Sequence, residues 1–142
     1  HLAVEPRCRE AAAIAAAFRV HAAIDVSDGL ALDLSRMMAA SGTAAILDLD
    51  AVPVHADAER LAAQDGRSAL EHALGDGEDF ELLLTMPRDE ATRLLGQWAS
   101  GSSSTPLTII GEVTSGSGLW VRSKGSEPRQ LTPQGYTHGF VT

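Results

Sequence analysis

The sequence predicts a single α+β domain, in which a mixed sheet has helices packed on it. Helical and strand patterns follow one another along the chain without strict alternation, which favours this class. The 142 residues are enough for one domain with a hydrophobic core and too few for two ordinary domains. No internal repeat and no long linker divides the chain. We therefore expect residues 1–142 to form one domain.

Residues 22–34 predict a strand, a tight turn and the start of a helix. Residues 22–26 are apolar and partly β-branched, as in a strand end, and residues 27–29 are turn and helix-start residues. The apolar side chains that follow recur at helical spacing and form one buried face: Leu30, Leu34, Met37 and Met38. Gly42 is expected to end this helix. Asp33 falls off the apolar face, so we expect it to meet solvent or a local partner.

The remaining elements follow from local patterns. Residues 10–19 predict a helix, because Ile14 and Phe18 lie four residues apart in an alanine-rich run. In order along the chain, the later patterns predict a strand at 44–49, short helices at 56–63 and 68–74, a strand at 80–85, a helix from 87 to about 98, and strands at 107–113 and 119–122. Residues 115–118 predict a turn, so the last two strands are expected to form a hairpin.

Composition and charge exclude several classes of function. The formal net charge is −8 and there is no basic run, which argues against nucleic acid and anionic membrane surfaces as partners. Cys8 is the only cysteine, so neither an intrachain disulfide nor a cysteine zinc cluster can form. No apolar run approaches the roughly 18 residues of a membrane span, and no signal peptide is evident. We expect a cytoplasmic protein. A start at His1 instead of Met suggests a fragment of a longer protein or a processed form.

Polar residues gather where the first predicted strand meets its helix. Asp25, Ser27 and Asp28 lie at this junction, where a helix N-terminus offers unpaired N–H groups and a partial positive charge. Two carboxylates there would repel a bare polyphosphate, but a divalent cation reverses the sign. Mg²⁺ binds carboxylate oxygens and shares its other positions with water and phosphate. Asp25 and Asp28 are therefore candidate ligands of a metal–nucleotide site. Alternatively, Ser27 or Asp28 is a helix N-cap and Asp25 a turn residue.

A second acidic turn precedes the predicted strand at 80–85. Glycines at 75 and 77 permit backbone conformations with positive φ, which lets the carboxylates of Glu78 and Asp79 crowd a concave edge. The alternative interpretation is an ordinary acidic loop. Asp48 and Asp50 lie near another strand end, where we expect them to cap the strand in solvent; the alternative is that they extend the acidic site. We predict that the carboxylates of the two acidic turns converge on one cleft.

With both acidic turns present, the chain resembles the C-terminal domain of the thiamine-monophosphate kinase family. This family belongs to the aminoimidazole-ribonucleotide-synthetase-like superfamily. The similarity runs in order along nearly the whole chain: Pro6-Arg7, Ile24-Asp25-Val26-Ser27-Asp28-Gly29-Leu30 with Asp33-Leu34, Ser41-Gly42, residues 49–53, residues 73–83 around Gly77-Glu78-Asp79, Ile110-Gly111-Glu112-Val113, and Gly135-Tyr136-Thr137-His138. Three features depart from the family. Asp76 stands where the family usually has Gly, Phe80 often where it has Tyr, and the end at 137–140 has an extra residue. Asp76 thus adds a charge near the expected site.

The resemblance implies ATP-dependent phosphorylation of thiamine monophosphate to thiamine diphosphate with Mg²⁺. By this resemblance, Asp25 and Asp28 match metal ligands and Ser27 matches an ATP contact. Glu78, with Asp79 beside it, matches a contact to the thiamine end. Tyr136 matches an aromatic position near the substrate's rings, where stacking on the cationic thiazolium is reasonable; the alternative role for Tyr136 is to anchor the tail.

The family's enzyme also has an N-terminal ATP- and metal-binding domain, which is absent from this chain, and it is usually a homodimer. We therefore expect the isolated chain to be inactive. Two alternatives stay open: a non-catalytic module that binds a thiamine phosphate or a partner chain, and another ATP-using member of the superfamily, such as a selenophosphate or hydrogenase-maturation protein. The sequences of both turns disfavour the latter.

Overall fold

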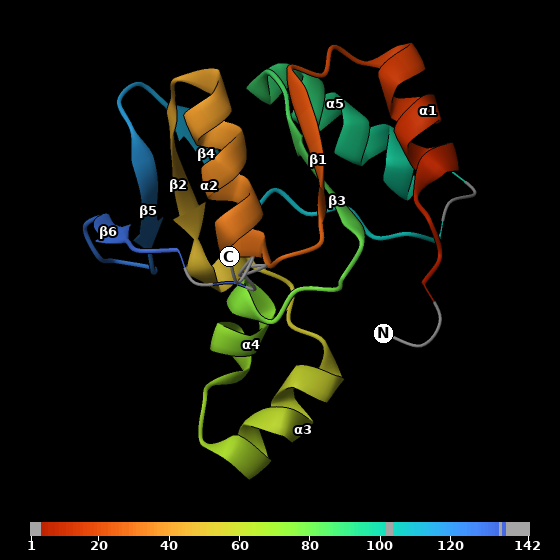
Figure 1. Cartoon of the computed structure of the whole chain (residues 1–142). Coiled ribbons are helices and arrows are strands. Elements are labelled where there is room, and N and C mark those ends of the chain that lie inside the picture. Colours follow the sequence, from red (N-terminus) through yellow and green to blue (C-terminus); the bar gives the residue numbers. More distant parts are fainter. Residues whose placement is uncertain (1–3, 102–103, 134, 136–142) are drawn as a thin grey trace, which may run out of the picture.

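The computed structural model of the chain describes residues 4–101, 104–133 and 135 (Figure 1). Helices and strands mix along these residues, so the predicted α+β class is confirmed. In chain order the elements are α1 (Cys8–Ala17), β1 (Ala22–Val26), α2 (Leu30–Ser41), β2 (Ala44–Asp48), the 3-10 helix η1 (Leu49–Ala51), α3 (Ala56–Asp65), α4 (Ala69–Gly75), β3 (Glu81–Thr85), α5 (Arg88–Ala99), β4 (Gly111–Thr114), β5 (Gly118–Arg122) and β6 (Arg129–Leu131).

The strands form two sheets. β1 and β3 pair antiparallel, with Asp25 opposite Leu82 and Val26 opposite Glu81. The other sheet has the order β4-β2-β5-β6, and its only parallel pair within the described residues is β2 with β5. In Figure 1 the two sheets stand on either side of α2.

The predicted hairpin between the last two long strands is wrong. β4 and β5 do not pair with each other, because β2 lies between them and bonds to both. The connection from Thr114 to Gly118 crosses the start of β2, where Ala44 is opposite both residues. A short link can cross two strand spacings of about 4.8 Å each, because an extended chain reaches about 3.3 Å per residue. The turn itself is present, but a turn signal does not say which strands pair.

The strand predicted at residues 107–113 is shorter in the structure, where β4 spans only residues 111–114. β4 begins only at Gly111, which lies opposite Leu47, and the last contact before it is the Asp48 N–H donating to the Ile110 carbonyl at 2.8 Å. After Asp48 the chain turns into η1, so β2 does not extend along residues 107–109. Gly111 itself packs so closely on the Ile46 carbonyl and Leu47 Cα that a Cβ would not fit.

The hydrophobic core surrounds α2. The predicted apolar face of this helix is buried, and it packs on β1, β2, β5 and α4. Side chains from both sheets complete the core: Val26, Ala45, Leu47, Leu83, Leu119 and Val121. α2 ends as predicted at Gly42, whose φ of 65° is the left-handed conformation that stops a helix. The core therefore fixes both the helix that carries the first acidic turn and the sheet that carries the second.

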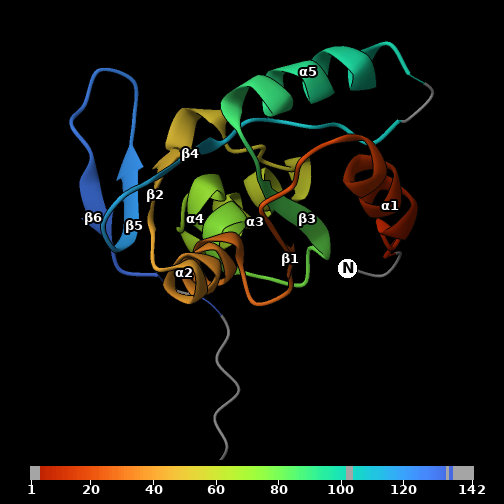
Figure 2. The ribbon, with the colours of Figure 1, turned by 90° about the horizontal axis from the view of Figure 1, so that it is seen from above.

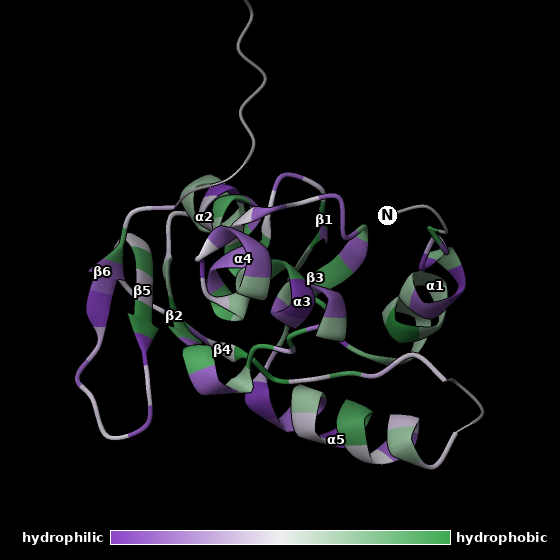
Figure 3. Cartoon of the chain, turned by 90° about the horizontal axis from the view of Figure 1, so that it is seen from below, coloured by the Kyte–Doolittle hydropathy of each residue, from purple (hydrophilic) through white to green (hydrophobic). Residues whose placement is uncertain are grey.

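Two outer regions complete the molecule. α3 and α4 lie together below α2 in Figure 1, and none of the residues of α3 is buried. α1 lies at the end of the molecule opposite β6, a separation that Figure 2 also shows. Along α5, hydrophobic and hydrophilic residues alternate (Figure 3), and only Leu94 is buried. No helix among the described residues has the length and apolar character needed to cross a membrane.

Candidate functional site

The first turn, residues 27–29, joins β1 to α2. Gly29 occupies the N-cap position with a φ of 117°, and no side chain caps the helix there. The alternative that Ser27 or Asp28 caps the helix is therefore wrong. Gly29 also packs closely on the end of α4, because a Cβ at this position would lie 3.1 Å from the Gly75 carbonyl carbon and oxygen.

Asp33, in the first turn of α2, bonds the backbone just before the helix. Its Oδ2 accepts hydrogen bonds from the Ser27 N–H at 3.0 Å and the Asp28 N–H at 2.9 Å. The residue is only 1% exposed. Of the two expectations for Asp33, solvent is wrong and a local partner is confirmed. Because Asp33 already bonds these two N–H groups, they are not available to a phosphate.

Arg36 connects the side chains of Asp33 and Asp28. Its Nη1 donates to Asp33 Oδ1 at 2.8 Å and to the Asp28 carboxylate. The Asp28 side chain is 16% exposed and that of Arg36 is 46% exposed. The candidate metal ligand Asp28 thus has a positively charged partner on the helix that follows it.

The second turn, residues 76–80, runs from the end of α4 to β3. Three of its residues have left-handed backbone conformations: Gly77 at φ 72°, Glu78 at φ 59° and Phe80 at φ 52°. Such a conformation costs a non-glycine residue about 1–2 kcal/mol. Strained residues of this kind cluster at functional sites, where the surrounding structure holds them.

The two turns are in direct contact. The Glu78 N–H donates to the Ser27 carbonyl and the Phe80 N–H to the Val26 carbonyl, both at 2.8 Å. A Cβ on Gly77 would lie 2.7 Å from the Ser27 oxygen, so only glycine fits this contact. The backbones of the two predicted turns therefore meet, although about 50 residues separate them in the sequence.

The predicted site residues differ in their exposure. Asp25 is exposed at the end of β1, Ser27 and Asp28 are half-buried, and Glu78 and Asp79 are exposed. Desolvation of its carboxyl raises the pKa of Asp79, and the nearby charges of Glu81 and Asp76 raise it further. Tyr136 lies outside the described residues. Just before it, Gly135 packs on the first turn, since a Cβ there would lie 2.5 Å from the Asp28 carbonyl oxygen.

Asp76, which departs from the family pattern, caps the end of α4 and pairs with two basic side chains. Its carboxylate lies 2.8 Å from Arg67 Nη1 and 2.6 Å from His72 Nδ1. His72 is 4% exposed, and its Nε2 lies 3.2 Å from Asp65. The added charge is therefore largely compensated by these two partners, although it still contributes to the raised pKa of Asp79.

Sequence reasoning missed the roles of Asp33, Arg36 and His72. A signal for Asp33 existed: an Asp in the first turn of a helix whose N-cap is glycine can reach back to unpaired backbone N–H groups. Arg36 lies three residues further on, within reach of Asp33 on the same helix face. Nothing in the sequence placed His72 between two carboxylates. Asp48 and Asp50 were expected to face solvent. Asp50 is exposed as expected and accepts a hydrogen bond from the Lys124 N–H at 2.6 Å, whereas Asp48 is half-buried and pairs with Arg122.

The residue types at the first turn suit part of a Mg²⁺ site. Carboxylates are suitable ligands, and Asp25 and Asp28 flank one turn. Among the described residues, however, no group of three or more His, Cys, Asp or Glu side chains is placed to hold a metal ion. Mg²⁺ prefers an octahedral shell and retains several waters. The two aspartates would therefore supply only a minority of its ligands.

The fold and the paired turns define the class of protein. The family model described as AIR synthase related protein, C-terminal domain, matches residues 1–124. This match covers most of the chain, so the chain belongs to this family and corresponds to its C-terminal domain.

Curated relatives make the assignment more specific. A thiamine-monophosphate kinase from Rhodopirellula baltica is 44% identical over 139 residues, which cover 98% of this chain and 43% of the relative. The thiamine-monophosphate kinase of Escherichia coli strain K12 is 34% identical over 142 residues, covering all of this chain and 42% of the relative. The chain thus corresponds to the C-terminal part of thiamine-monophosphate kinases and spans about two fifths of the length of these relatives.

Solved structures agree. A thiamine-monophosphate kinase from Stenotrophomonas maltophilia K279a superposes with a TM-score of 0.68 at 37% identity, over 84% of this chain and 35% of that one. A complex named AaThiL with AMPPCP and TMP gives a TM-score of 0.69 at 26% identity, over 94% of this chain and 38% of that one. The hydrogenase maturation protein HypE of E. coli has a TM-score of 0.73, but at 20% identity it shares the fold alone.

Proposed function

We propose that this chain is the C-terminal part of an enzyme that phosphorylates thiamine monophosphate with ATP, giving thiamine diphosphate and ADP. In this reaction a phosphate oxygen of thiamine monophosphate bonds to the γ-phosphorus of ATP, and the bond from that phosphorus to the β–γ bridging oxygen breaks. The observation that carries the proposal is the contact between the two acidic turns, through the Glu78 and Phe80 N–H groups. The similarity to curated thiamine-monophosphate kinases supports the choice of substrates.

The first turn would meet the nucleotide and the second the acceptor. Asp25 and Asp28 are proposed Mg²⁺ ligands, and Ser27 a proposed contact to ATP. When bound, Mg²⁺ neutralises charge on the phosphate oxygens as the phosphoryl group moves. The chain's own part is to position the reactants, because phosphoryl transfer needs alignment and charge stabilisation more than covalent help.

The second turn carries negative charge at an exposed edge, which suits a cationic thiazolium ring. Glu78 and Asp79 are the proposed contacts to the thiamine end. Tyr136 is the proposed aromatic partner of the substrate's rings. Gly135 supports this role, because it seats the chain directly before Tyr136 against the carbonyl of Asp28.

The proposal includes parts beyond this chain. An N-terminal domain would provide the remaining metal ligands and much of the nucleotide site, in keeping with the two fifths of its relatives that this chain spans. The complete enzyme is proposed to be a cytoplasmic homodimer.

The test uses the complete protein that contains this chain, with ATP, Mg²⁺ and thiamine monophosphate, and measures thiamine diphosphate by chromatography. We expect product only when all three are present. Asp28→Asn is expected to lower kcat/KM about 10–100-fold and to raise the Mg²⁺ concentration required, because one ligand charge is lost.

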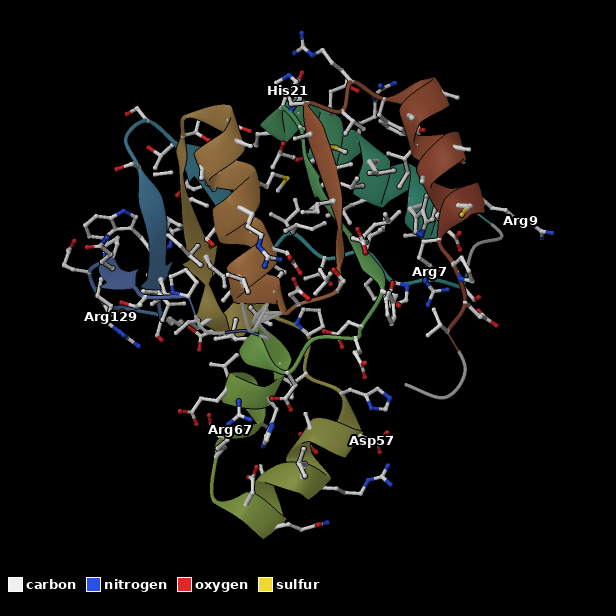
Figure 4. All side chains as sticks on the ribbon, in the orientation of Figure 1. Arg7, Arg9, His21, Asp57, Arg67 and Arg129 are labelled. Carbon is white, nitrogen blue, oxygen red and sulfur yellow. The ribbon has the colours of Figure 1, made fainter. Side chains whose placement is uncertain are left out.

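Asp57→Asn is the matched control, since Asp57 is exposed on α3 and belongs to neither turn (Figure 4). This variant should keep the activity of the wild type. Unchanged activity and Mg²⁺ dependence in Asp28→Asn would remove Asp28 from the site. Absence of product from the wild-type protein would contradict the function itself.

A further inference from the structure

We propose that Asp33 is the positioning residue of the first turn and holds Ser27 and Asp28 in the geometry that their proposed roles require. The effect on turnover rests on the function proposed above, whereas the effect on the turn does not. The observation behind it is the pair of hydrogen bonds from the Ser27 and Asp28 N–H groups to one carboxylate oxygen, at 3.0 and 2.9 Å.

Because Asp33 is buried, its carboxylate depends on these hydrogen bonds. A buried carboxylate is costly unless hydrogen bonds and an opposite charge compensate it. At 1% exposure Asp33 has both, because Oδ2 accepts the two backbone N–H groups and Oδ1 accepts Arg36 Nη1 at 2.8 Å. Hydrogen bonds to a charged acceptor are about twice as strong as neutral ones.

The same network reaches the Asp28 side chain. Arg36 Nη1 donates to both Asp33 and Asp28, so the position of Asp28 is fixed twice. Its backbone is held by the N–H bond to Asp33, and its carboxylate is held by the arginine that Asp33 orients. Residues that orient a metal ligand in this way typically contribute about 10–100-fold to affinity or activity.

Asp33 also supports the second turn indirectly. The carbonyls of Val26 and Ser27 accept the N–H groups of Phe80 and Glu78. A first turn that loses its two bonds to Asp33 is free to shift these carbonyls. Gly29, at the N-cap, has no side chain that could take the place of Asp33.

The experiment compares variants of the complete protein by peptide-resolved hydrogen exchange and by steady-state kinetics. In Asp33→Ala, we expect the Ser27 and Asp28 amides to exchange at least about 10-fold faster and kcat to fall about 10–100-fold, with KM for thiamine monophosphate nearly unchanged. Asp33→Asn keeps a carbonyl oxygen for the two N–H groups and is expected to restore most of the protection and activity.

Two further variants separate the parts of the network. Arg36→Met removes the link to Asp28 but leaves the two N–H bonds, so the turn amides should stay protected. Asp48→Ala is the matched control. Asp48 also pairs with an arginine, Arg122, but it lies at the end of β2 and not beside the first turn. This control should change neither the exchange of the turn nor kcat.

The proposal is overturned if the Ser27 and Asp28 amides of Asp33→Ala exchange as in the wild type. It is also overturned if core amides such as those of Leu83 and Val121 accelerate equally, since Asp33 would then act on global stability alone. Faster exchange with an unchanged kcat would contradict the positioning role. If the wild-type protein forms no thiamine diphosphate, the proposed function fails, and the exchange data still decide whether Asp33 holds the turn.

Discussion

Gly77 lies at the contact between the two acidic turns. Two separate features require glycine at this position. Its φ is 72°, and a Cβ would lie only 2.7 Å from the Ser27 oxygen. Gly66, at the end of α3, shares only the first reason: its φ is 81°, and none of the described atoms would lie within 4 Å of a Cβ there. Comparing the two glycines therefore separates the cost of backbone conformation from the cost of the contact.

We predict that Gly66→Ala lowers the free energy of unfolding by about 1–2 kcal/mol, the cost of a left-handed non-glycine residue. Gly77→Ala should lower it by about 1–3 kcal/mol more, because the methyl group must also displace the first turn. Urea unfolding of both variants measures the difference. If both variants lose the same free energy of unfolding, the contact between the turns at Gly77 adds no steric cost.

At the scale of elements, helices α3 and α4, here called the α3–α4 unit, hold the start of the second turn. Ser68 and Glu71 form a capping box at the start of α4. At its end, His72 bonds to Asp76, the first residue of the second turn, and to Asp65 at the end of α3. Arg67, which Figure 4 shows beside α4, pairs with the same Asp76 and donates to the Glu71 carbonyl.

This arrangement makes the stability of the unit depend on pH. Hydrogen bonding to Asp76, and then to Asp65, raises the pKa of His72 above its ordinary value, although burial opposes the shift. The folded protein thus holds the proton more tightly than the unfolded chain. The stabilisation is complete below about pH 6.5 and is lost as the pH rises through the folded-state pKa.

We therefore predict that the melting temperature falls as the pH rises above about 6.5, and that His72→Gln abolishes most of this fall. His21→Gln is the control, because His21 is exposed at the start of β1 (Figure 4). Thermal unfolding followed by circular dichroism at several pH values gives the comparison. The same slope in wild type and His72→Gln would contradict the assignment.

The elements also show what a sequence can predict. The strand, turn and helix at residues 22–42 were predictable because each signal is local, down to Gly42 as the stop. The pairing of β4 and β5 was not, since the turn at 115–117 fits a hairpin as well as a crossing over β2. For Asp33, helical spacing showed only that it lies off the apolar face. Its burial depends on a turn that folds back over it.

At the scale of the whole molecule, α2 connects the two halves of the site. It lies between the two sheets and packs on β2. Near its N-terminus, Asp33 accepts hydrogen bonds from the Ser27 and Asp28 N–H groups. The segment before α1 is tied to β3 by a bidentate ion pair, in which Arg7 Nε and Nη2 lie 2.9 and 2.7 Å from the Glu81 carboxylate (Figure 4). The chain thus has its own core and its own connections between distant segments, and we expect it to fold when expressed alone.

Folding alone does not complete the site, and this difference can be tested. We predict that the isolated 142-residue chain shows cooperative thermal unfolding but forms no thiamine diphosphate from ATP, Mg²⁺ and thiamine monophosphate. Asp25 and Asp28 are the only metal ligands proposed in this chain, the described residues hold no group of three or more candidate ligands, and Mg²⁺ bridging phosphates needs a more complete shell to be held in place. The complete protein, assayed in parallel, is the positive control. Turnover by the isolated chain at a rate near that of the complete protein would show that these two turns suffice, and would make a preceding domain unnecessary for catalysis.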